Sequence, residues 1–411
     1  MSLRILMVNK FYYEAGGAER YVLSLSALLE REGYEVVPFA MRDERNLPTP
    51  FAGWFSPYVR VRGAMLPWER VRTAVHVVYS AGARRAIDRL IRYVRPDVAH
   101  VHNIYHHLSP SVLFALKEHR IPVVYTLHDL KLICANYSLF AHGAICERCK
   151  GNRHYQAVVQ RCCKGGLGAS LVGAVEMYLH SALKTYDRHV DLFISPSRFL
   201  RDKLAEFGVD VSRVRHIPNF VDVRTFSPQY GAGEGYVAYV GRVTLDKGVG
   251  TLVRAMAGLP HLELHVVGTG DALAGLQEMC ECQGVANVHF LGARPHSEVR
   301  KLMSRAAVVV VPSMLYDNCP ITVLEAFAMG KPVIGSRLGG IPELIADGVD
   351  GMLVPAGDAV ALRDAIARLM AQPRLIEEMG RNGRAKVERM YGAEAHLYAI
   401  RTVYAQVLGA A

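Results

Sequence analysis

The chain has 411 residues, of which 51% are hydrophobic and 21% are charged. This composition is typical of a globular enzyme and excludes a fibrous or disordered protein. The length predicts two domains of roughly 200 residues, each with its own core. No apolar run approaches the roughly 18 residues of a membrane-spanning helix. Because the start, MSLRILMVNKF, also has too short an apolar stretch for a signal peptide, we expect a cytoplasmic protein.

The net charge of +10 is unevenly distributed along the chain. Residues 1–190 hold 25 Lys and Arg against 15 acids, whereas residues 191–411 hold 23 of each. Segment 51–100 has nine Arg against three acids, interleaved with apolar residues such as Trp68 and Val71. No nucleic-acid-binding module is recognisable, so we expect no nucleic-acid partner. A basic amphipathic segment predicts peripheral binding to the anionic inner face of a membrane; a solvated helix face is the alternative.

The first forty residues predict a strand–helix–strand unit, RILMVN, RYVLSLSALLEREG and YEVVPFA. Near-continuous apolar runs, many rich in valine, then alternate with helical stretches, as in buried parallel strands. These further strands are predicted at 97–102, 122–129, 191–197, 236–243, 262–268, 288–292, 307–313 and 332–336.

This alternation predicts an α/β protein of two doubly wound, Rossmann-like domains facing a central cleft. Segment 214–222 is predicted to be a hinge, and segment 392–411 a terminal helix. The predicted domains are residues 1–218, joined by the terminal helix 392–411, and residues 219–391.

The turn after the strand at 236–243 places Arg242 and Lys247 beside a helix start. Two cations near backbone N–H groups at a helix N-terminus form a favourable seat for a diphosphate, although a plain surface turn is the alternative. The next strand end carries Gly268 and Gly270, which permit close backbone approach.

In the first half, Gly16 and Gly17 open a helix and are predicted to line the same cleft, a tight turn being the alternative. His128 and Asp129 end a strand, where the imidazole can reach a ligand and the Asp129 carboxylate is expected to orient it. No Asp-x-Asp pair occurs in the sequence, so a metal held by that device is not expected.

A predicted buried helix starts near Asn318 and Pro320 and ends at Gly330. Glu325 is its single charged side chain. A lone buried carboxylate is costly unless a ligand or partner satisfies it, so Glu325 is predicted either to bind a ligand or to pair with a group of its own core neighbourhood.

Several motifs of this chain resemble those of the retaining glycosyltransferases of family 4, which have the GT-B fold. They are AGGAERY, TLHD, IPNFVD, VGRVTLDKG, VVGTGD, the pair Asp317-x7-Glu325, and EAFAMGKPVIGSRLGGIPELI. The resemblance covers nearly the whole chain. It implies metal-independent transfer of a hexose-type sugar from a UDP- or GDP-sugar to a saccharide or lipid-linked acceptor, with retained configuration. It also implies that the terminal helix returns to the N-terminal domain.

The resemblance assigns roles by matching position. Glu325 would hold the ribose hydroxyls, Asp317 the hydroxyls of the donor sugar, and Arg242 and Lys247 the diphosphate. Gly17 would line the phosphate site, and His128 would lie near the reacting face of the sugar. Asp317 replaces the family's usual Glu, which leaves glucose-like and mannose-like donors both open. The remaining donor-binding positions implied are Gly16, Gly268, Gly270, Arg294, Asn318, Cys319, Pro320, Ile321 and Thr322.

Two rival functions remain at this point, and a phosphorylase is a third option, which would require a lysine environment for pyridoxal phosphate and usually a much longer chain. A nucleotide-sugar epimerase could use the same two-domain plan, although the cleft sequences show no set of acids and bases for it. A non-catalytic nucleotide-sugar-binding protein is the other, and the Asp at position 317 leaves room for it.

Five of the eight cysteines cluster between residues 134 and 163. Their spacing is compatible with a structural zinc site formed by Cys134, Cys146, Cys149 and either Cys162 or Cys163. No cofactor is expected for catalysis. A reduced loop without metal is the alternative.

Overall fold

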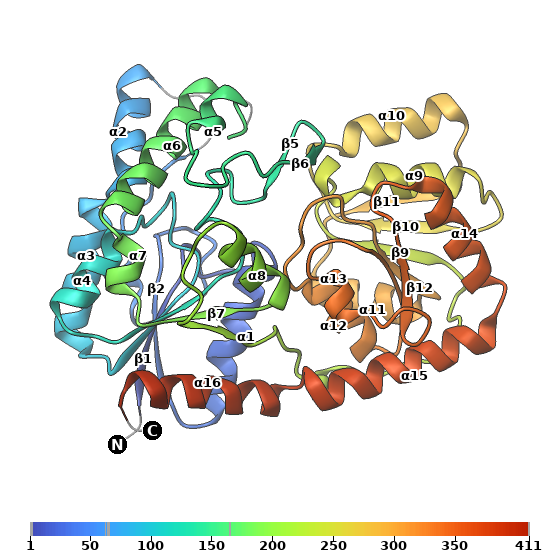
Figure 1. Ribbon diagram of the computed structural model, residues 1–411. Helices are drawn as coiled ribbons and strands as arrows, with labels where there is room; N and C mark the ends of the chain where they lie inside the picture. The colour runs from blue at the N-terminus through green and yellow to red at the C-terminus, as the bar shows by residue number, and fades with distance from the viewer. Residues whose placement is uncertain (1–2, 62, 64–65, 164–165, 410–411) are drawn as a thin grey trace. The chain divides into compact units, whose positions relative to one another are not determined.

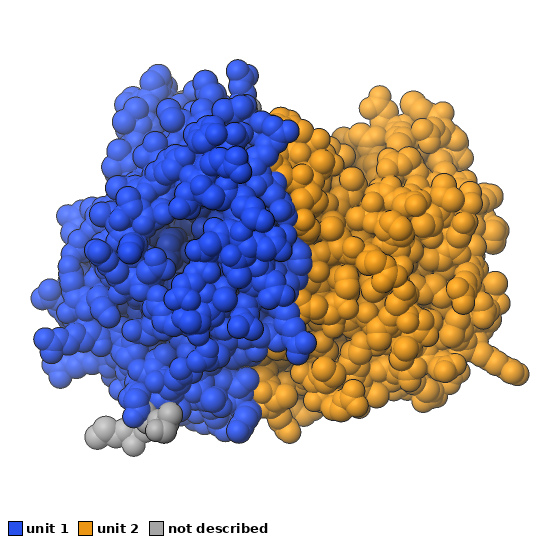
Figure 2. Space-filling view, viewed as in Figure 1, with its two compact units in different colours: residues 1–139, 147–217, 397–411 blue, residues 140–146, 218–396 orange. Residues whose placement is uncertain are grey.

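The computed structural model describes residues 3–61, 63, 66–163 and 166–409 (Figure 1). The chain divides into two compact units (Figure 2). Unit 1 comprises residues 1–139, 147–217 and 397–411, and unit 2 comprises residues 140–146 and 218–396. The prediction from sequence placed the boundary after residue 218 and did not separate residues 140–146.

Unit 1 is built on a six-stranded parallel sheet with the order β2-β1-β3-β4-β7-β8. Its inner strands are buried because their side chains are apolar on both faces, as parallel sheets covered by helices require. The chain reverses its direction of winding between β1 and β3, so polar loops gather at the carboxyl ends of these strands. The strands are β1 (Arg4–Val8), β2 (Glu35–Phe39), β3 (Val98–Val101), β4 (Val123–Thr126), β7 (Leu192–Ser195) and β8 (Val214–His216).

Helices flank this sheet (Figure 1), and a two-stranded antiparallel hairpin of β5 (Phe140–Ala141) and β6 (Ala144–Ile145) follows β4 in sequence. Ser80 and Ser197 cap α3 and α8 by accepting hydrogen bonds from backbone N–H groups. The helices are α1 (Gly17–Arg31), η1 (Ala52–Trp54), α2 (Pro67–Val78), α3 (Ala81–Val94), α4 (Ser111–Glu118), α5 (Gln156–Val159), α6 (Leu167–Ala182), α7 (Thr185–His189) and α8 (Arg198–Glu206).

Unit 2 contains a second six-stranded parallel sheet, with the order β11-β10-β9-β12-β13-β14. Its valine-rich strands pack between two hydrophobic clusters, one on each face. The strands are β9 (Val237–Val240), β10 (Leu264–Val267), β11 (Val288–Gly292), β12 (Val308–Val311), β13 (Val333–Ser336) and β14 (Gly351–Val354). The helices are η2 (Val223–Thr225), η3 (Leu245–Lys247), α9 (Val249–Ala257), α10 (Leu273–Gln283), α11 (His296–Arg305), α12 (Ile321–Ala328), α13 (Ile341–Leu344), α14 (Ala359–Met370) and α15 (Pro373–Met390).

The last helix, α16 (Ala393–Val407), passes from unit 2 into unit 1. His396 still belongs to unit 2, where its Nδ1 lies 3.0 Å from the carbonyl oxygen of Pro218. Tyr404 belongs to unit 1, where its hydroxyl hydrogen-bonds Nδ1 of His100 at 2.7 Å. The predicted return of the terminal helix to the first domain is confirmed.

The prediction of two doubly wound, parallel-sheet domains is confirmed, and every predicted strand is present. The segment predicted as a hinge, residues 214–222, begins with the edge strand β8. Strand β14 was not predicted, because its short run, GMLV, lies between turns and has little periodicity.

Candidate functional site

The loops that follow the strands of unit 2 carry most of the predicted site residues. Arg242 and Lys247 follow β9, Gly268 and Gly270 follow β10, and Asp317 follows β12. Because the strands are parallel, their carboxyl ends meet at one edge of the sheet. The geometry below shows which of these residues are in contact.

Lys247 and Asp317 form the central contact of this edge. The ammonium Nζ of Lys247 lies 2.5 Å from Oδ1 of Asp317, and both side chains are largely buried. The other carboxylate oxygen of Asp317 accepts a hydrogen bond from the Ser313 hydroxyl. An ammonium group has three N–H donors. Lys247 therefore stays held in place by Asp317 while retaining capacity for an anionic ligand.

Backbone contacts fix the loops that carry this pair. The carbonyl oxygen of Asp246 accepts from the N–H groups of Met314 and Leu315 at 2.9 and 3.2 Å. The carbonyl oxygen of Asp317 accepts from the N–H of Gly340 at 2.7 Å. The loops after β9, β12 and β13 are thus bonded to one another, so the ion pair sits on a rigid support.

Arg242 and Arg294, the two arginines predicted at this edge, are more exposed than Lys247 and Asp317. The Arg242 side chain is 67% exposed, with one guanidinium nitrogen 3.9 Å from the Asp246 carboxylate. Arg294 is also exposed and donates through Nε to the carbonyl oxygen of Leu291 at 3.0 Å. Arg294 also lies 3.8 Å from the Glu298 carboxylate. Exposure leaves both guanidinium groups accessible to an anionic ligand.

Glu325 lies on α12 and is 2% exposed. Its helix is buried from Val323 to Ala328, as the sequence predicted. Nε2 of His296, the first residue of α11, lies 3.7 Å from the Glu325 carboxylate. His296 was not predicted as a site residue, because its contact with Glu325 joins positions far apart in the sequence.

The residues between Asp317 and Glu325 form the start of α12. Cys319 is buried, and burial raises the pKa of its thiol to about 12. Its carbonyl oxygen accepts from the side-chain amide of Asn219 at 2.7 Å, which anchors the loop. Val323 and Leu324 are also buried. The other four side chains are partly exposed, namely Asn318, Pro320, Ile321 and Thr322.

Neighbouring backbone leaves no space for a side chain at the two predicted glycines of this edge, Gly268 and Gly270. A Cβ on Gly268 would lie 1.9 Å from the carbonyl oxygen of Gly241, and one on Gly270 would lie 2.2 Å from that of Val243. Both distances are far shorter than a van der Waals contact, so only glycine fits. Close packing of adjacent loops explains these residues, and they give no independent sign of a ligand.

Gly17 differs from these glycines. It is the first residue of α1 and is exposed, and an added Cβ would meet no atom within 4 Å. For Gly16, which precedes the helix, an added Cβ would lie 3.4 Å from the Glu19 carboxylate. The chain therefore leaves open space at Gly17, which a ligand can occupy.

His128 lies just after β4, where burial and the nearby charge of Lys10 lower its pKa to about 3. Its Nε2 lies 3.0 Å from Nδ1 of His102, whose Nε2 lies 3.0 Å from the sulfur of Met7. A thioether cannot donate, so Nε2 of His102 carries its proton and Nδ1 accepts from His128. Neutral His128 then has an unprotonated Nδ1, which can accept a hydrogen bond.

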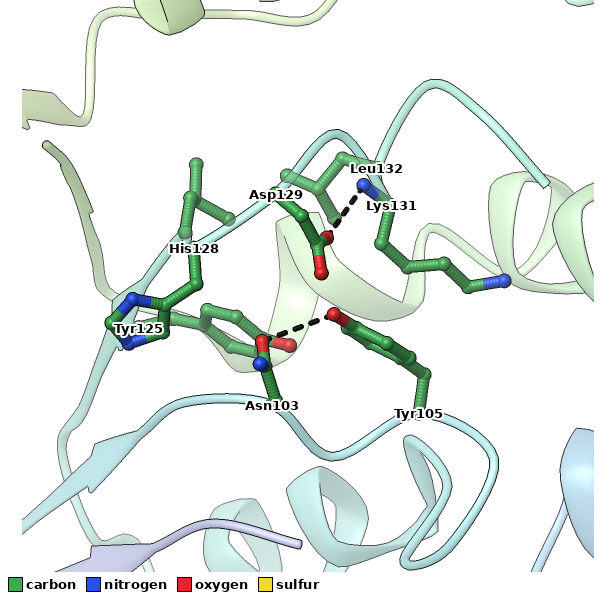
Figure 3. Close-up of a pocket in the computed structure, with 8 residues that line it drawn as sticks. Asn103, Tyr105, Tyr125, His128, Asp129, Lys131 and Leu132 are labelled. Carbon is green, nitrogen blue, oxygen red and sulfur yellow. Dashed lines mark hydrogen bonds between the residues drawn. The ribbon is translucent and has the colours of Figure 1, made fainter. Parts of the chain in front are cut away.

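A small pocket lies next to His128 and is drawn in Figure 3. Asp129 points into it toward Tyr105, and the Asp129 carboxylate accepts from the backbone N–H of Lys131 at 3.0 Å. Burial raises the pKa of Asp129 to about 6. The Tyr105 hydroxyl donates to Asn103 at 3.1 Å. The sequence indicated Asp129 as a partner that orients His128, whereas the structure places it in this pocket.

Lys131 also lines this pocket, and its ammonium lies 2.5 Å from the Glu176 carboxylate on α6. Both side chains are 5% exposed or less. The sequence reasoning missed this pair, because 45 residues separate its members.

The cysteine cluster is only partly assembled. In unit 1, a hydrogen bond with Cys163, together with burial and the nearby Cys134 and Cys149, raises the pKa of Cys162. Among the residues that the structure describes, however, three potential metal ligands approach within 4.8 Å of one another only at Glu263, His265 and His289. A four-cysteine zinc site is therefore not preformed, and zinc binding there remains a prediction.

Two family models together match most of the chain. The model described as Glycosyltransferase Family 4 matches residues 15–225, which is just over half of the chain. The model described as Glycosyl transferases group 1 matches residues 224–386.

Individual relatives are similar along almost the full length. Glycogen synthase from Mycobacterium tuberculosis is 26% identical over 98% of this chain and 94% of its own. D-inositol 3-phosphate glycosyltransferase from Segniliparus rotundus is 28% identical, covering 92% of this chain and 81% of its own. Among solved structures, sucrose-phosphate synthase from Thermosynechococcus elongatus has a TM-score of 0.74 at 23% identity, with both chains fully covered. Anabaena HepE in complex with UDP and glucose has a TM-score of 0.70 at 17% identity, covering 98% of this chain and all of its own. These two structures share the fold.

Proposed function

Because the chain belongs to glycosyltransferase family 4, we propose that it transfers a hexose-type sugar from a UDP- or GDP-sugar to a saccharide or lipid-linked acceptor. We further propose that the anomeric configuration is retained and that no catalytic metal is needed. The observation that carries this proposal is the Lys247–Asp317 pair at the carboxyl edge of the unit 2 sheet. Relatives named as glycogen synthase and as mannosyltransferases agree with a hexose donor.

Charge development explains why a cation is needed at this edge. When the bond from the sugar to the diphosphate breaks, negative charge grows on the leaving phosphate. Lys247, kept in position by Asp317, and the exposed Arg242 are suited to stabilise this charge. In this proposal, the positive charge of Lys247 and Arg242 replaces a divalent cation. An Asp-x-Asp motif, which would hold such a cation, is absent from the sequence.

The remaining site residues are assigned roles in the same proposal. Glu325 accepts hydrogen bonds from the two ribose hydroxyls, and Asp317 offers an oxygen to a hydroxyl of the donor sugar. Nδ1 of His128 accepts from a sugar hydroxyl, since this neutral imidazole has a lone pair there. A phosphate oxygen of the donor takes the proton of the acceptor, so no protein base is required.

The test is a transfer assay with UDP- and GDP-sugars, in which NMR follows the anomeric proton of the product. Retained configuration and unchanged rates with a chelator support the proposal. Incubation of each donor alone detects an isomerised sugar, the product of the rival epimerase. Isomerisation without transfer, or transfer with inversion, contradicts the proposal.

Gly17→Ala gives a prediction that separates function from folding. The added methyl group meets no protein atom, so the melting temperature should stay equal or rise slightly. If Gly17 lines the phosphate site, the methyl group displaces the donor, and kcat/KM should fall by about tenfold or more. Gly275→Ala is the matched control, since Gly275 on α10 is also exposed with open space around it. Equal activity of both variants would remove Gly17 from the site.

A further inference from the structure

We propose that three helices of unit 1 form a surface that binds the anionic face of a phospholipid bilayer. Helices α2 and α5 both contact α6, and the three lie side by side in Figure 1. Large apolar side chains on and beside these helices point to solvent, and we call them the apolar face. They are Leu66, Trp68, Val71, Val75, Tyr155, Val159, Leu167, Leu171, Val175, Tyr178, Leu179 and Leu183.

Helix α6 carries the strongest evidence. Its outward side chains recur at helical spacing, and Leu171 and Val175 are about half exposed, at 53% and 49%. The only charged residue from Leu167 to Leu183 is Glu176, which points inward and is 1% exposed. A helix facing water normally carries a polar outer face. An apolar outer face of this extent marks an interaction surface.

The charges near the apolar face are mainly positive. In segments 58–78 and 152–184, the exposed charged side chains described are Arg60, Arg70, Arg72, Arg153, Arg161 and Lys184. Of the acids in these segments, Glu69 accepts from the backbone N–H of Leu66 and Glu176 is buried. Helix α7, which contacts α6, adds one exposed acid, Asp187, and one exposed cation, Arg188, so the balance stays positive. Apolar side chains with mainly cationic neighbours in the chain complement a bilayer that contains acidic lipids.

The same charges disfavour a second copy of this chain as the partner. A two-fold symmetric contact would place each basic segment against its own copy or near it, and like charges would repel. None of the helices in the described residues is long and apolar enough to cross a bilayer. The proposed contact is therefore peripheral, with the helices lying in the headgroup region.

Helix α6 links this face to the pocket beside His128. On its inward side, Glu176 pairs with Lys131, which lines the pocket together with Asp129. Binding through α6 would hold the pocket about one helix diameter, roughly 10 Å, from the lipid surface. The pocket could then reach an acceptor that is attached to a membrane lipid, while that lipid stays in the bilayer. This last step rests on the proposed function, whereas vesicle binding does not.

The apolar part of the proposal is tested by sedimentation of the full chain with vesicles of phosphatidylcholine, alone or mixed with phosphatidylglycerol. The protein should bind the mixed vesicles, and Leu171→Gln with Val175→Gln should weaken this binding by about tenfold or more. Gln keeps helix propensity, and both sites are exposed, so melting temperatures should be unchanged. Val349→Gln with Val360→Gln is the control, because these unit 2 residues are equally exposed, at 52% and 58%.

The charge part is tested by Arg70→Gln with Arg72→Gln. Binding to the mixed vesicles should fall by about tenfold at low salt, and added salt should weaken wild-type binding in the same way. Arg374→Gln with Arg389→Gln removes the same charge from exposed sites of unit 2 and should have little effect.

Two outcomes would overturn the proposal. The first is equal binding of the wild type to neutral and mixed vesicles, or binding that none of these variants changes. The second is a dimer in sedimentation velocity that Leu171→Gln with Val175→Gln dissociates, in a protein that binds no vesicles. The apolar face would then be an interface between copies of the chain.

Discussion

Lys247→Ala is expected to lower kcat by about 100-fold or more. Loss of one preorganised donor to a developing charge typically costs roughly 2.7–4 kcal/mol of transition-state stabilisation. Lys247 is placed for this role because Asp317 holds its ammonium at 2.5 Å on a loop bonded to its neighbours. Steady-state assays of sugar transfer measure the effect, and kcat should fall more than the donor KM rises. Exposed Lys301 is the matched control, since Lys301→Ala should leave kcat unchanged.

A second variant separates catalysis from support of the loop. Lys247→Ala leaves the Asp317 carboxylate without its ammonium partner, which costs about 1–3 kcal/mol of stability. In Lys247→Ala with Asp317→Asn, that unpaired charge is removed. The reference is Asp317→Asn alone, because Asp317 is itself proposed to contact the donor sugar. If the loss of kcat came only from the stranded carboxylate, Lys247→Ala would cost nothing further in the Asp317→Asn background. We expect the double variant to be much slower than Asp317→Asn, and equal rates of the two would contradict the catalytic role of Lys247.

Glu325→Gln is expected to weaken binding of the nucleoside diphosphate by about 10–100-fold. A carboxylate can accept from both ribose hydroxyls, whereas the Gln amide has one acceptor oxygen. Each hydrogen bond to a charged group contributes about 1.5–3 kcal/mol. Isothermal titration calorimetry measures the change, and Gln keeps the volume of this buried side chain, so no cavity forms.

The control for Glu325 addresses its contact with His296. If Glu325 served only to pair with His296 inside unit 2, the Gln variant would lose stability but keep its affinity for the nucleotide. Glu378→Gln makes the same chemical change at an exposed position of α15 and should affect neither quantity. Unchanged affinity in Glu325→Gln would place the nucleotide elsewhere.

The sequence predicted the fold well because its signals are local. Valine-rich runs such as AVVVVPS report burial on both faces of a sheet, and these runs became strands. The lone Glu325 in an apolar helix could also be found from sequence, since a buried charge is conspicuous in any pattern. The edge strand β8, in contrast, has a mixed burial pattern that resembles a loop.

Contacts between distant segments could not be predicted in the same way. Two such contacts are the pairs Lys131–Glu176 and His296–Glu325. Both depend on how loops and helices pack, and residue types alone do not predict this packing. The close packing at Gly268 depends on a neighbouring loop, so the sequence suggested a ligand where the chain itself requires glycine. The apolar outer face of α6 did leave a signal, namely apolar residues at helical spacing from Leu167 to Leu183, but only exposure distinguishes it from a core helix.

The most direct measurement of the central claim is a thermal-shift series with UDP, GDP, ADP and their common sugar conjugates. A ligand at 100 times its Kd adds about 2.7 kcal/mol to the stability of the unit that binds it. For a domain of this size, that corresponds to a rise in melting temperature of roughly 5 °C or more. We predict such a rise with UDP or GDP and its sugar conjugate, and a smaller one in Glu325→Gln. No rise with any nucleotide, in protein that circular dichroism shows to be folded, would contradict a nucleotide-sugar donor and leave only the fold.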